Sequence, residues 1–458
     1  MSATFDAIVI GAGQAGPSLA GRLTGAGMKV ALVERHLFGG TCVNTGCMPT
    51  KALVASAYAA HLARRADDYG VTIGGEVGVD MKRVHARAMK VSSDARRNVE
   101  AWLNGMQGLT VLRGHARFSG PHSVDVDGET LAAERIFINV GGRAAAPDMP
   151  GIGDIDYLTN TSILQLDSLP RHLVIVGGSY IGLEFAQMFR RFGAQVTIVE
   201  KGPRLIARED EDISAAIRDI LEGEGIAVRT GAECIAFRAV PEGVAVRVDC
   251  RDGAPEEIGS HVLLAVGRRP NTDDLGLDKA GIATDARGYV TVDETLQTNV
   301  EGIWALGDCN GRGAFTHTSY NDYEIVAANL LDGAKRSLEQ RIGGYALYVD
   351  PPLGRVGMSE AQARATGRKL LIGTRPMSRV GRAIEKGETL GLMKIVADAE
   401  SRRILGAAIL GTGGDEAIHG VLDMMNADQP YDTLQWAVPI HPTVSELIPT
   451  VLGEMKPA

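Results

Sequence analysis

Two cysteines and a lysine within residues 39–51 have the types and the spacing for thiol redox chemistry. Cys42 and Cys47 stand five positions apart, and Lys51 follows one helical turn after the second. On an ideal helix, positions five apart lie roughly 8–9 Å from each other at Cα, whereas a disulfide tolerates at most about 7 Å. The two cysteines can therefore bond only if the segment bends, which Gly46 and Pro49 would allow. A strained, accessible disulfide is of the labile, catalytic kind. The alternative is a pair of unrelated buried thiols.

A glycine-rich turn near the N-terminus has the features of a dinucleotide-binding loop. An apolar run over residues 6–10 leads into Gly11, Gly13 and Gly16, and a second apolar run ends at Glu34 after a helical stretch. The first glycine permits a tight turn, the second lets backbone approach a pyrophosphate, and the third allows close helix–strand packing. The acid can accept a hydrogen bond from a ribose 2′-hydroxyl. We therefore expect a dinucleotide here, with its phosphates at the helix N-terminus.

The same unit recurs over residues 173–200. In both units the first glycine is followed by another glycine 16 residues later and by a glutamate 23 residues later. The second unit has Gly177, Gly178 and Gly182 in its loop and Glu200 at its end, and Ser179 occupies the second glycine position. Two such units in one chain favour two dinucleotide sites, one for a flavin and one for a nicotinamide.

Composition limits the class of protein. A chain of 458 residues should hold two to four domains, and its 57 glycines suit α/β packing with many tight turns. The net charge of −9 argues against a nucleic-acid or membrane-surface partner. No apolar run approaches the length of a membrane span, and a strand-like run from Ala7 leads us to expect no leader peptide. Five cysteines do not make a secreted disulfide scaffold, so we expect a reducing cytoplasm, where a cysteine pair is catalytic or metal-binding rather than structural.

The elements that must position these residues can be placed coarsely. Residues 303–309 read as a strand that ends in Gly307 and Asp308, and residues 316–331 as a helix capped by Thr316 or Thr318. The N-terminus of that helix would stabilise negative charge on the pyrimidine side of a flavin. The pattern of strands, helices and connectors predicts three domains. The first dinucleotide domain comprises residues 1–150 and 272–340, the second is inserted into it at 151–271, and the final domain, 341–458, has no phosphate loop.

Two further titratable residues, Glu184 and His441, are candidates for the site. Glu184 lies on or near the apolar stripe of the second unit's helix, where an unpaired carboxylate would be costly. It is either a surface-edge residue or a partner of Lys51. His441 stands before a proline and five residues before Glu446, which suggests a base that is oriented by a carboxylate.

Together these motifs resemble the pyridine nucleotide–disulfide oxidoreductases, the family of dihydrolipoamide dehydrogenase, glutathione reductase and mercuric reductase. The resemblance covers nearly the whole chain. It rests on the segment 39–51, the paired glycine units, Val-Gly-Arg-Arg-Pro-Asn at 266–271, Gly-Asp at 307–308 and His-Pro-Thr-Val-Ser-Glu at 441–446. It implies an α/β fold with two Rossmann-like domains, one for FAD and one for NAD(P), the second inserted in the first, plus a C-terminal α+β dimerisation domain.

The resemblance also implies roles. Cys47 would face the flavin and Cys42 would exchange with substrate, while Lys51 and Glu184 would form an ion pair beside the flavin N5 edge. His441, oriented by Glu446, would serve Cys42 as acid and base from the partner subunit, which implies a homodimer. The candidate cofactor-binding residues are Gly11, Gly13, Gly16, Glu34, Gly40, Thr41, Lys51, Ala116, Gly141, Gly177, Gly178, Gly182, Glu200, Gly267, Gly307 and Asp308.

The expected reaction passes electrons from a nicotinamide through FAD to a Cys42–Cys47 disulfide and on to a small disulfide or dithiol. Glu200 favours NADH because a carboxylate would repel a 2′-phosphate; NADPH is the alternative, given Lys201 and Arg204 nearby. We expect no resident metal.

Three departures bear on the substrate. No cysteine follows Cys309, so we do not expect the C-terminal cysteine pair of mercuric reductases. We also expect no N-terminal metal-binding module of the kind that mercuric reductases have. Cys42-Val43-Asn44 and Ser179 nevertheless look more like the mercuric branch, and Asn139-Val140-Gly141-Gly142 replaces the family's usual Ala-Thr-Gly. A reductase of soft metal ions such as mercury or copper is therefore the second interpretation. From other classes, a redox sensor without turnover and a plain flavin NADH oxidase remain alternatives.

Overall fold

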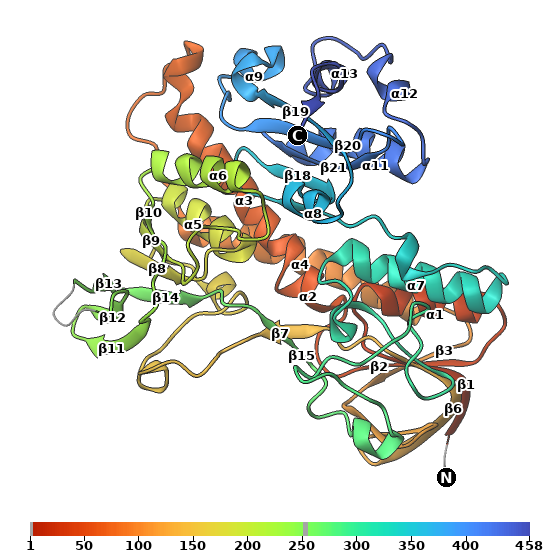
Figure 1. Cartoon of the computed structure of the whole chain (residues 1–458). Helices are drawn as coiled ribbons and strands as arrows, with labels where there is room; N and C mark the ends of the chain where they lie inside the picture. Colours follow the sequence, from red (N-terminus) through yellow and green to blue (C-terminus); the bar gives the residue numbers. More distant parts are fainter. Residues whose placement is uncertain (1–2, 251–254) are drawn as a thin grey trace. The chain divides into compact units, whose positions relative to one another are not determined.

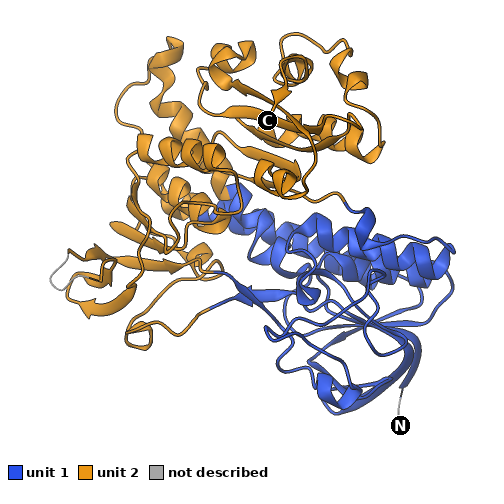
Figure 2. Ribbon diagram, in the orientation of Figure 1, with its two compact units in different colours: residues 1–52, 85–145, 267–341 blue, residues 53–84, 146–266, 342–458 orange. Residues whose placement is uncertain are grey.

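The computed structural model describes residues 3–250 and 255–458 and consists of two compact units. Unit 1 comprises residues 1–52, 85–145 and 267–341, and unit 2 comprises residues 53–84, 146–266 and 342–458 (Figure 2). Each unit is assembled from separate stretches of the chain, as expected when one domain is inserted into another. The finer division into four ranges stays a prediction.

Unit 1 is built on a parallel sheet whose central strands carry buried apolar runs at residues 7–10, 30–33 and 136–138, as a sheet covered on both faces requires. Its strands follow the order β3-β2-β1-β6, with β16 also parallel to β6, and the antiparallel pair β4–β5 extends the sheet from β6. The strands are β1 (Ala3–Ile10), β2 (Val30–Glu34), β3 (Leu109–Arg113), β4 (Ala116–Gly120), β5 (Ser123–Val126), β6 (Glu129–Ile138) and β16 (Ile303–Ala305).

Helices α1 (Ala15–Gly25) and α7 (Thr316–Leu331) lie side by side against this sheet (Figure 1). Their apolar residues, among them Leu19, Leu23, Ile325 and Val326, are packed into one core cluster with residues of the parallel strands. The predicted helix over 316–331 is confirmed. The predicted strand over 303–309 is too long, because β16 ends at Ala305 and Gly307–Asn310 form a turn of 3-10 helix.

Unit 2 contains a second parallel sheet, in the order β10-β9-β8-β14, and a three-stranded antiparallel meander, β11-β12-β13. The strands are β8 (His172–Val176), β9 (Gln195–Val199), β10 (Ala227–Arg229), β11 (Ala236–Val240), β12 (Gly243–Arg247), β13 (Glu257–Gly259) and β14 (His261–Leu264), and the accompanying helices are α5 (Tyr180–Phe192) and α6 (Glu211–Gly223). Both predicted strand–glycine–helix–strand units are therefore present, one in each compact unit.

The C-terminal part of unit 2 is an antiparallel sheet in the order β17-β18-β21-β20-β19-β22. Its strands are β17 (Gly344–Leu347), β18 (Leu353–Gly357), β19 (Leu370–Pro376), β20 (Leu392–Asp398), β21 (Ile404–Leu410) and β22 (Lys456–Pro457), and short helices α8 (Glu360–Ala365), α9 (Gly381–Glu385), α10 (Gly414–Ala417), α11 (His419–Asn426), α12 (Asp432–Gln435) and α13 (Ile448–Gly453) accompany them. The fold class is confirmed: two Rossmann-like domains and a C-terminal α+β domain. Within the described ranges, no helix combines the length and apolarity of a membrane span.

The cysteines correct one expectation. Cys234 and Cys250 form a disulfide in unit 2, whereas Cys42, Cys47 and Cys309 are free thiols. We expected no structural disulfide, and that expectation is wrong, because the two residues flank a hairpin that brings them together although they lie 16 positions apart. The expected Cys42–Cys47 bond is not formed in this structure, which holds that pair in its dithiol form.

Candidate active site

The segment that carries the two candidate redox cysteines is bent, as the spacing required. Helix α2 (Gly40–Asn44) ends before Thr45, and helix α3 (Cys47–Arg64) begins at Cys47. Gly46 lies at the break, and a Cβ there would approach the Thr41 carbonyl oxygen to 2.9 Å. The Asn44 side chain stabilises the bend, since its Nδ2 donates to the carbonyls of Phe38 and Gly40, both at 2.9 Å.

The bend brings Cys42 and Cys47 into hydrogen-bonding contact and separates their acidities. The hydrogen bond with Cys47, together with burial, raises the pKa of Cys42 above the ordinary thiol range. The hydrogen bond from Cys42 lowers the pKa of Cys47 to about 6, and Thr316, the charge of Lys51 and backbone hydrogen bonding at the start of α3 act in the same direction. Near neutral pH the pair therefore holds one proton, and Cys47 is the thiolate.

Thr316 connects this pair to the start of helix α7. Its Oγ1 lies 3.2 Å from Cys47 Sγ. The sequence suggested Thr316 or Thr318 as the helix cap. Thr318 fulfils that role from within the first turn, because its Oγ1 accepts from the Phe315 N–H at 3.1 Å and donates to the Phe315 carbonyl at 2.7 Å. Thr316 instead offers its hydroxyl to the thiolate, so the positive end of the α7 dipole faces negative charge.

The first glycine loop has the close packing that its spacing predicted. Gly11 has a φ of +105°, and a Cβ there would lie 2.3 Å from the Asn139 carbonyl oxygen; a Cβ on Gly16 would lie 2.2 Å from the Gly11 carbonyl oxygen. The buried Asn139 side chain also donates to the Gly11 carbonyl at 3.1 Å. Glu34 closes the loop, since its carboxylate accepts from the N–H of Ala12 at 2.8 Å and of His36 at 2.7 Å.

The second loop repeats this arrangement in unit 2. A Cβ on Gly177 would lie 2.4 Å from the Ala265 carbonyl oxygen, and one on Gly182 would lie 2.1 Å from the Gly177 carbonyl oxygen. The Glu200 carboxylate accepts from the N–H groups of Gly178 and Gly202, each at 2.6 Å. Both acids thus orient their own turn while keeping further lone pairs free for a ribose hydroxyl.

These two loops fit dinucleotides. Among the described residues, neither N-cap residue, Gln14 for α1 or Ser179 for α5, caps its helix through a side chain, and the positive end of each helix dipole lies at its glycine loop, where it would favour phosphate oxygens. Both loops combine a tight glycine turn with such a helix start, which is the arrangement that binds a pyrophosphate. The chain's own residues therefore fit one dinucleotide in each unit.

The structure also places the other candidate cofactor residues of unit 1, apart from Lys51. Gly40 packs against Gly13, with a Cβ distance of 2.8 Å to its Cα, and joins the cysteine segment to the first loop. Gly141 and Gly267 have φ values of +64° and +121° with open space beside them. Gly307 donates its N–H to the buried Asp322 at 2.7 Å. The remaining three are Thr41, which is exposed on α2, Ala116, which is buried in β4, and Asp308, whose pKa is raised by burial.

The candidate base, His441, and the predicted partner of Lys51, Glu184, both lie in unit 2. His441 Nδ1 and Glu446 Oε2 are 2.9 Å apart, so the expected hydrogen bond is present, and the histidine side chain is 79% exposed. Glu184 is 5% exposed and accepts from the Tyr348 N–H at 3.0 Å, which excludes the surface-edge alternative. Lys51 belongs to unit 1, and its pairing with Glu184 stays a prediction.

The sequence analysis assigned no role to two polar residues that support the glycine turns. Asn139 and Asp322 orient the glycines at 11 and 307. Asn139 directly follows the apolar run 136–138, which is a signal that could have revealed its role, whereas Asp322 lies in a polar stretch without such a signal. Among the described residues, no cluster of three or more His, Cys, Asp or Glu side chains could hold a metal ion.

Comparisons with known proteins agree with this geometry. Residues 5–322 match the family model of the pyridine nucleotide-disulphide oxidoreductases, and residues 345–452 match the dimerisation domain of the same family. The probable pyridine nucleotide-disulfide oxidoreductase RclA of Escherichia coli is 36% identical, with 99% of each chain covered. A mercuric reductase of Streptomyces lividans is 34% identical over 94% of this chain and 92% of its own.

A solved structure extends the likeness to three dimensions. The Cu(II) complex of the HOCl-induced flavoprotein disulfide reductase RclA from Escherichia coli superposes with a TM-score of 0.90 at 35% identity, with 99% of both chains covered. The match spans both dinucleotide loops, the cysteine segment and the C-terminal sheet. The chain therefore belongs to the pyridine nucleotide-disulphide oxidoreductase family and is an FAD-containing, NAD(P)H-dependent disulfide reductase.

Proposed function

We propose that Cys42 and Cys47 are the redox pair through which this enzyme reduces a small disulfide, with the reverse oxidation of a dithiol as the same reaction run backwards. The supporting observation is the hydrogen-bonded thiol pair, with Cys47 held as a thiolate by Cys42, Thr316 and Lys51. The first loop would hold FAD, which would supply the hydride and two-electron chemistry that links the reduced nicotinamide to this pair.

The different pKa values of Cys42 and Cys47 suggest that the two cysteines have different roles in the reaction. Cys42 attacks the substrate disulfide and forms a mixed disulfide, which expels one substrate thiol. Cys47 then attacks Cys42 Sγ, closes the Cys42–Cys47 bond and releases the second thiol. Because the pKa of Cys42 is raised, this residue needs a base, and we assign that role to His441 of the partner subunit with Glu446 orienting it. The enzyme would then be an obligate homodimer formed through the domain at residues 345–452.

The remaining site residues follow as part of the proposal. The loop residues Gly11, Gly13, Gly16 and Glu34 would hold FAD, together with Gly40, Thr41, Lys51, Ala116, Gly141, Gly267, Gly307 and Asp308. Gly177, Gly178, Gly182 and Glu200 would hold the nicotinamide nucleotide. We propose NADH over NADPH, because Glu200 would repel a 2′-phosphate. Arg204 donates to the carbonyls of Ala207 and Glu209 at 3.2 and 3.1 Å, so its guanidinium is partly engaged elsewhere. A cytoplasmic location belongs to the same proposal.

A soft-metal reductase is the second candidate. Its support is the likeness to mercuric reductases and to a relative solved as a Cu(II) complex, together with a thiolate that is accessible at the start of α3. The metal ion would be the substrate, since the described residues offer no resident metal site.

One parallel assay separates the two candidates. NADH consumption is measured with lipoamide, glutathione disulfide, Cu(II) and Hg(II), first with the purified holoenzyme and then with Cys42→Ser. If the substrate is a disulfide, we expect NADH consumption with lipoamide or glutathione disulfide in the holoenzyme and near-complete loss of this activity in Cys42→Ser. Cys309→Ala removes a buried thiol that donates to the carbonyls of Ile138 and Leu306, and this variant should keep activity. Consumption with metals alone would reject the disulfide substrate, and activity that survives Cys42→Ser would point to a plain NADH oxidase.

A further inference from the structure

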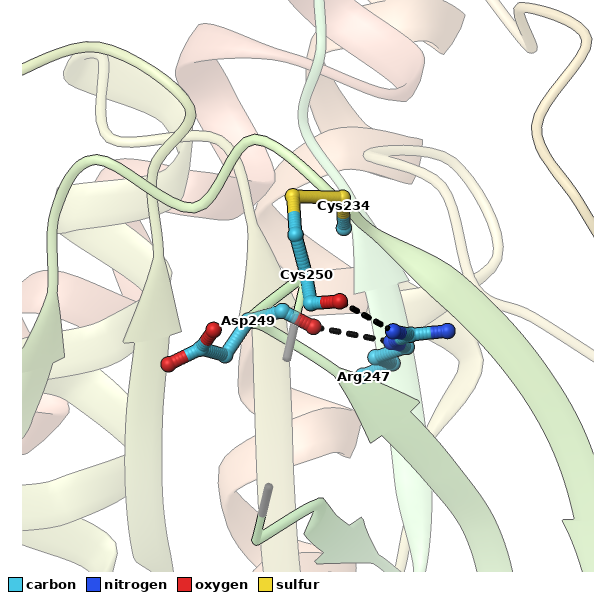
Figure 3. Close-up of a disulfide and its surroundings, with 4 residues drawn as sticks. All are labelled: Cys234, Arg247, Asp249 and Cys250. Carbon is cyan, nitrogen blue, oxygen red and sulfur yellow. Dashed lines mark hydrogen bonds between the residues drawn. A yellow bond between two sulfur atoms is a disulfide. The ribbon is translucent and has the colours of Figure 1, made fainter. Parts of the chain in front are cut away.

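A second thiol pair, outside the candidate active site, closes the open end of the β11–β12 hairpin. Cys234 precedes β11 and Cys250 follows β12, with their Cα atoms 5.0 Å apart (Figure 3). The last backbone pair of the hairpin is Ala236 with Arg247, so the disulfide continues the cross-strand connection beyond it. Arg247 also organises the second strand's exit, since its guanidinium donates to the carbonyls of Asp249 and Cys250, both at 2.8 Å.

This bond is accessible to small thiols. Cys250 is exposed and Cys234 is half-buried, whereas the third cysteine outside the active site, Cys309, is fully buried. A thiolate in solution can therefore reach Cys250 Sγ, with Cys234 as the leaving sulfur. Accessible disulfides of this kind are the ones that exchange with a thiol pool, in contrast to disulfides sealed in a core.

Cys234 of this bond lies two residues after Ala232, the last residue of the segment 229–232 that supports the second glycine loop. The Gly231 N–H donates to the Gly202 carbonyl at 2.8 Å, and the Ala232 N–H donates to the Glu200 carbonyl at 3.0 Å. The Glu200 N–H in turn donates to the Arg229 carbonyl at 2.8 Å. Segment 229–232 thus holds the turn whose carboxylate and glycine shape the second loop.

Packing ties this segment to the hairpin as well. Ala232 is 2% exposed and belongs to one core cluster with Phe237 of β11 and with Val244 and Val246 of β12. The disulfide therefore restrains three connected pieces: the hairpin, the segment before it and, through three backbone hydrogen bonds, the turn at Glu200. Opening the bond frees the N-terminal end of β11 at Cys234, next to Ala232.

We propose that Cys234 and Cys250 form a reversible disulfide that sets the affinity of the second loop for its nicotinamide nucleotide. A dithiol reductant opens it: one thiolate attacks Cys250 Sγ and releases the Cys234 thiolate, and the second thiol displaces Cys250, so the reductant leaves as its own disulfide and two electrons enter the protein. A small disulfide reverses the reaction and is reduced to two thiols. This inference rests on the proposed binding of the nicotinamide nucleotide at the second loop and goes beyond it, because it concerns the control of that binding and uses neither Cys42 nor Cys47.

The test measures binding in a protein that cannot turn over. Holoenzyme carrying Cys42→Ser is treated either with glutathione disulfide or with dithiothreitol and then desalted without oxygen. Titration calorimetry with NAD⁺ and with NADP⁺ gives the Kd of the tighter nucleotide in each state. We expect reduction to weaken binding by about fivefold to tenfold, the lower end of typical coupling between sites, because the bond acts through a few backbone hydrogen bonds.

The matched control is Cys42→Ser with Cys234→Ser and Cys250→Ser, which should show one Kd, equal to that of the reduced form, after both treatments. Cys250→Ser alone, at the exposed position, replaces it if the triple variant does not fold. Tryptic peptides report the bond itself: residues 230–238 and 248–251 should run as one linked species after glutathione disulfide and as two alkylated peptides after dithiothreitol.

Three outcomes would overturn the proposal. The first is a Kd that stays within twofold between the two states. The second is an equal response in the variant without the second cysteine pair, which would place the effect elsewhere. The third is full alkylation of both cysteines after treatment with glutathione disulfide, which would mean that the bond does not form. Each outcome leaves the disulfide reductase activity to be judged by its own assay.

Discussion

The hydroxyl of Thr316 allows a direct test of how the structure lowers the pKa of Cys47. Its Oγ1 lies 3.2 Å from Cys47 Sγ and helps to hold the pKa of that thiol at about 6. Thr316→Val keeps the shape of the side chain and removes the donor. A hydrogen bond to a charged group contributes roughly 1.5–3 kcal/mol, and one pKa unit corresponds to about 1.4 kcal/mol. Because Cys47 is exposed and water can replace part of the lost bond, we expect the lower end of that range.

The variant's Cys47 should therefore titrate with a pKa of about 7, one unit higher. The assay is the rate of alkylation by iodoacetamide in the dithiol enzyme between pH 5 and pH 9, with the modified cysteine located by peptide mass. At pH 6 the thiolate fraction would fall from about one half to about one tenth, so alkylation should slow roughly fivefold, while the two proteins should react equally at pH 9.

Two control variants isolate the hydroxyl. Thr316→Ser retains the donor and should titrate like the wild type. Thr318→Val removes the cap of α7 and leaves the Thr316 hydroxyl in place, so it reports the effect of loosening the helix start alone. If Thr316→Val titrates within about 0.3 units of the wild type, or if Thr316→Ser behaves like the valine variant, the hydroxyl does not stabilise the thiolate and the reasoning is wrong.

Three further predictions concern other parts of the chain. Glu446→Gln should lower kcat with the disulfide substrate about tenfold or more and leave nucleotide Kd unchanged, because it removes the carboxylate 2.9 Å from His441; equal kcat values would contradict the orienting role. Gly16→Ala should yield protein without bound flavin, whereas Gly182→Ala should keep the flavin and lose nucleotide binding, as seen in absorbance spectra and titrations; identical losses in both would argue against two separate loops. Lys394→Met should lower the free energy of unfolding by about 1–3 kcal/mol in urea melts, because it removes a buried ammonium that pairs with Asp210 and Glu360, although Arg355 and Arg364 still pair with these two carboxylates; a change below about 0.5 kcal/mol would contradict this.

Much of the fold was predictable because its signals are local. A buried apolar run, a glycine turn, a helix and a second apolar run ending in an acid leave few topologies open, and both such units are present with the expected glycine packing at Gly16 and Gly182. The bend between Cys42 and Cys47 also followed from local reasoning, since an unbroken helix would keep the sulfurs apart and Gly46 marks the break.

The sequence by itself therefore determined the two glycine-rich loops, the bent cysteine segment and the pairing of His441 with Glu446, all of which depend on residues at most 23 positions apart. Only the tertiary structure decided which threonine meets the thiolate, which asparagine supports the first glycine turn and which cysteines bond outside the active site. Thr316 lies 269 positions from Cys47, and Asn139 lies 128 positions from Gly11. The physical reason is that sheet order and helix packing bring these residues into contact, and neither produces a periodic pattern in the sequence at the residues concerned.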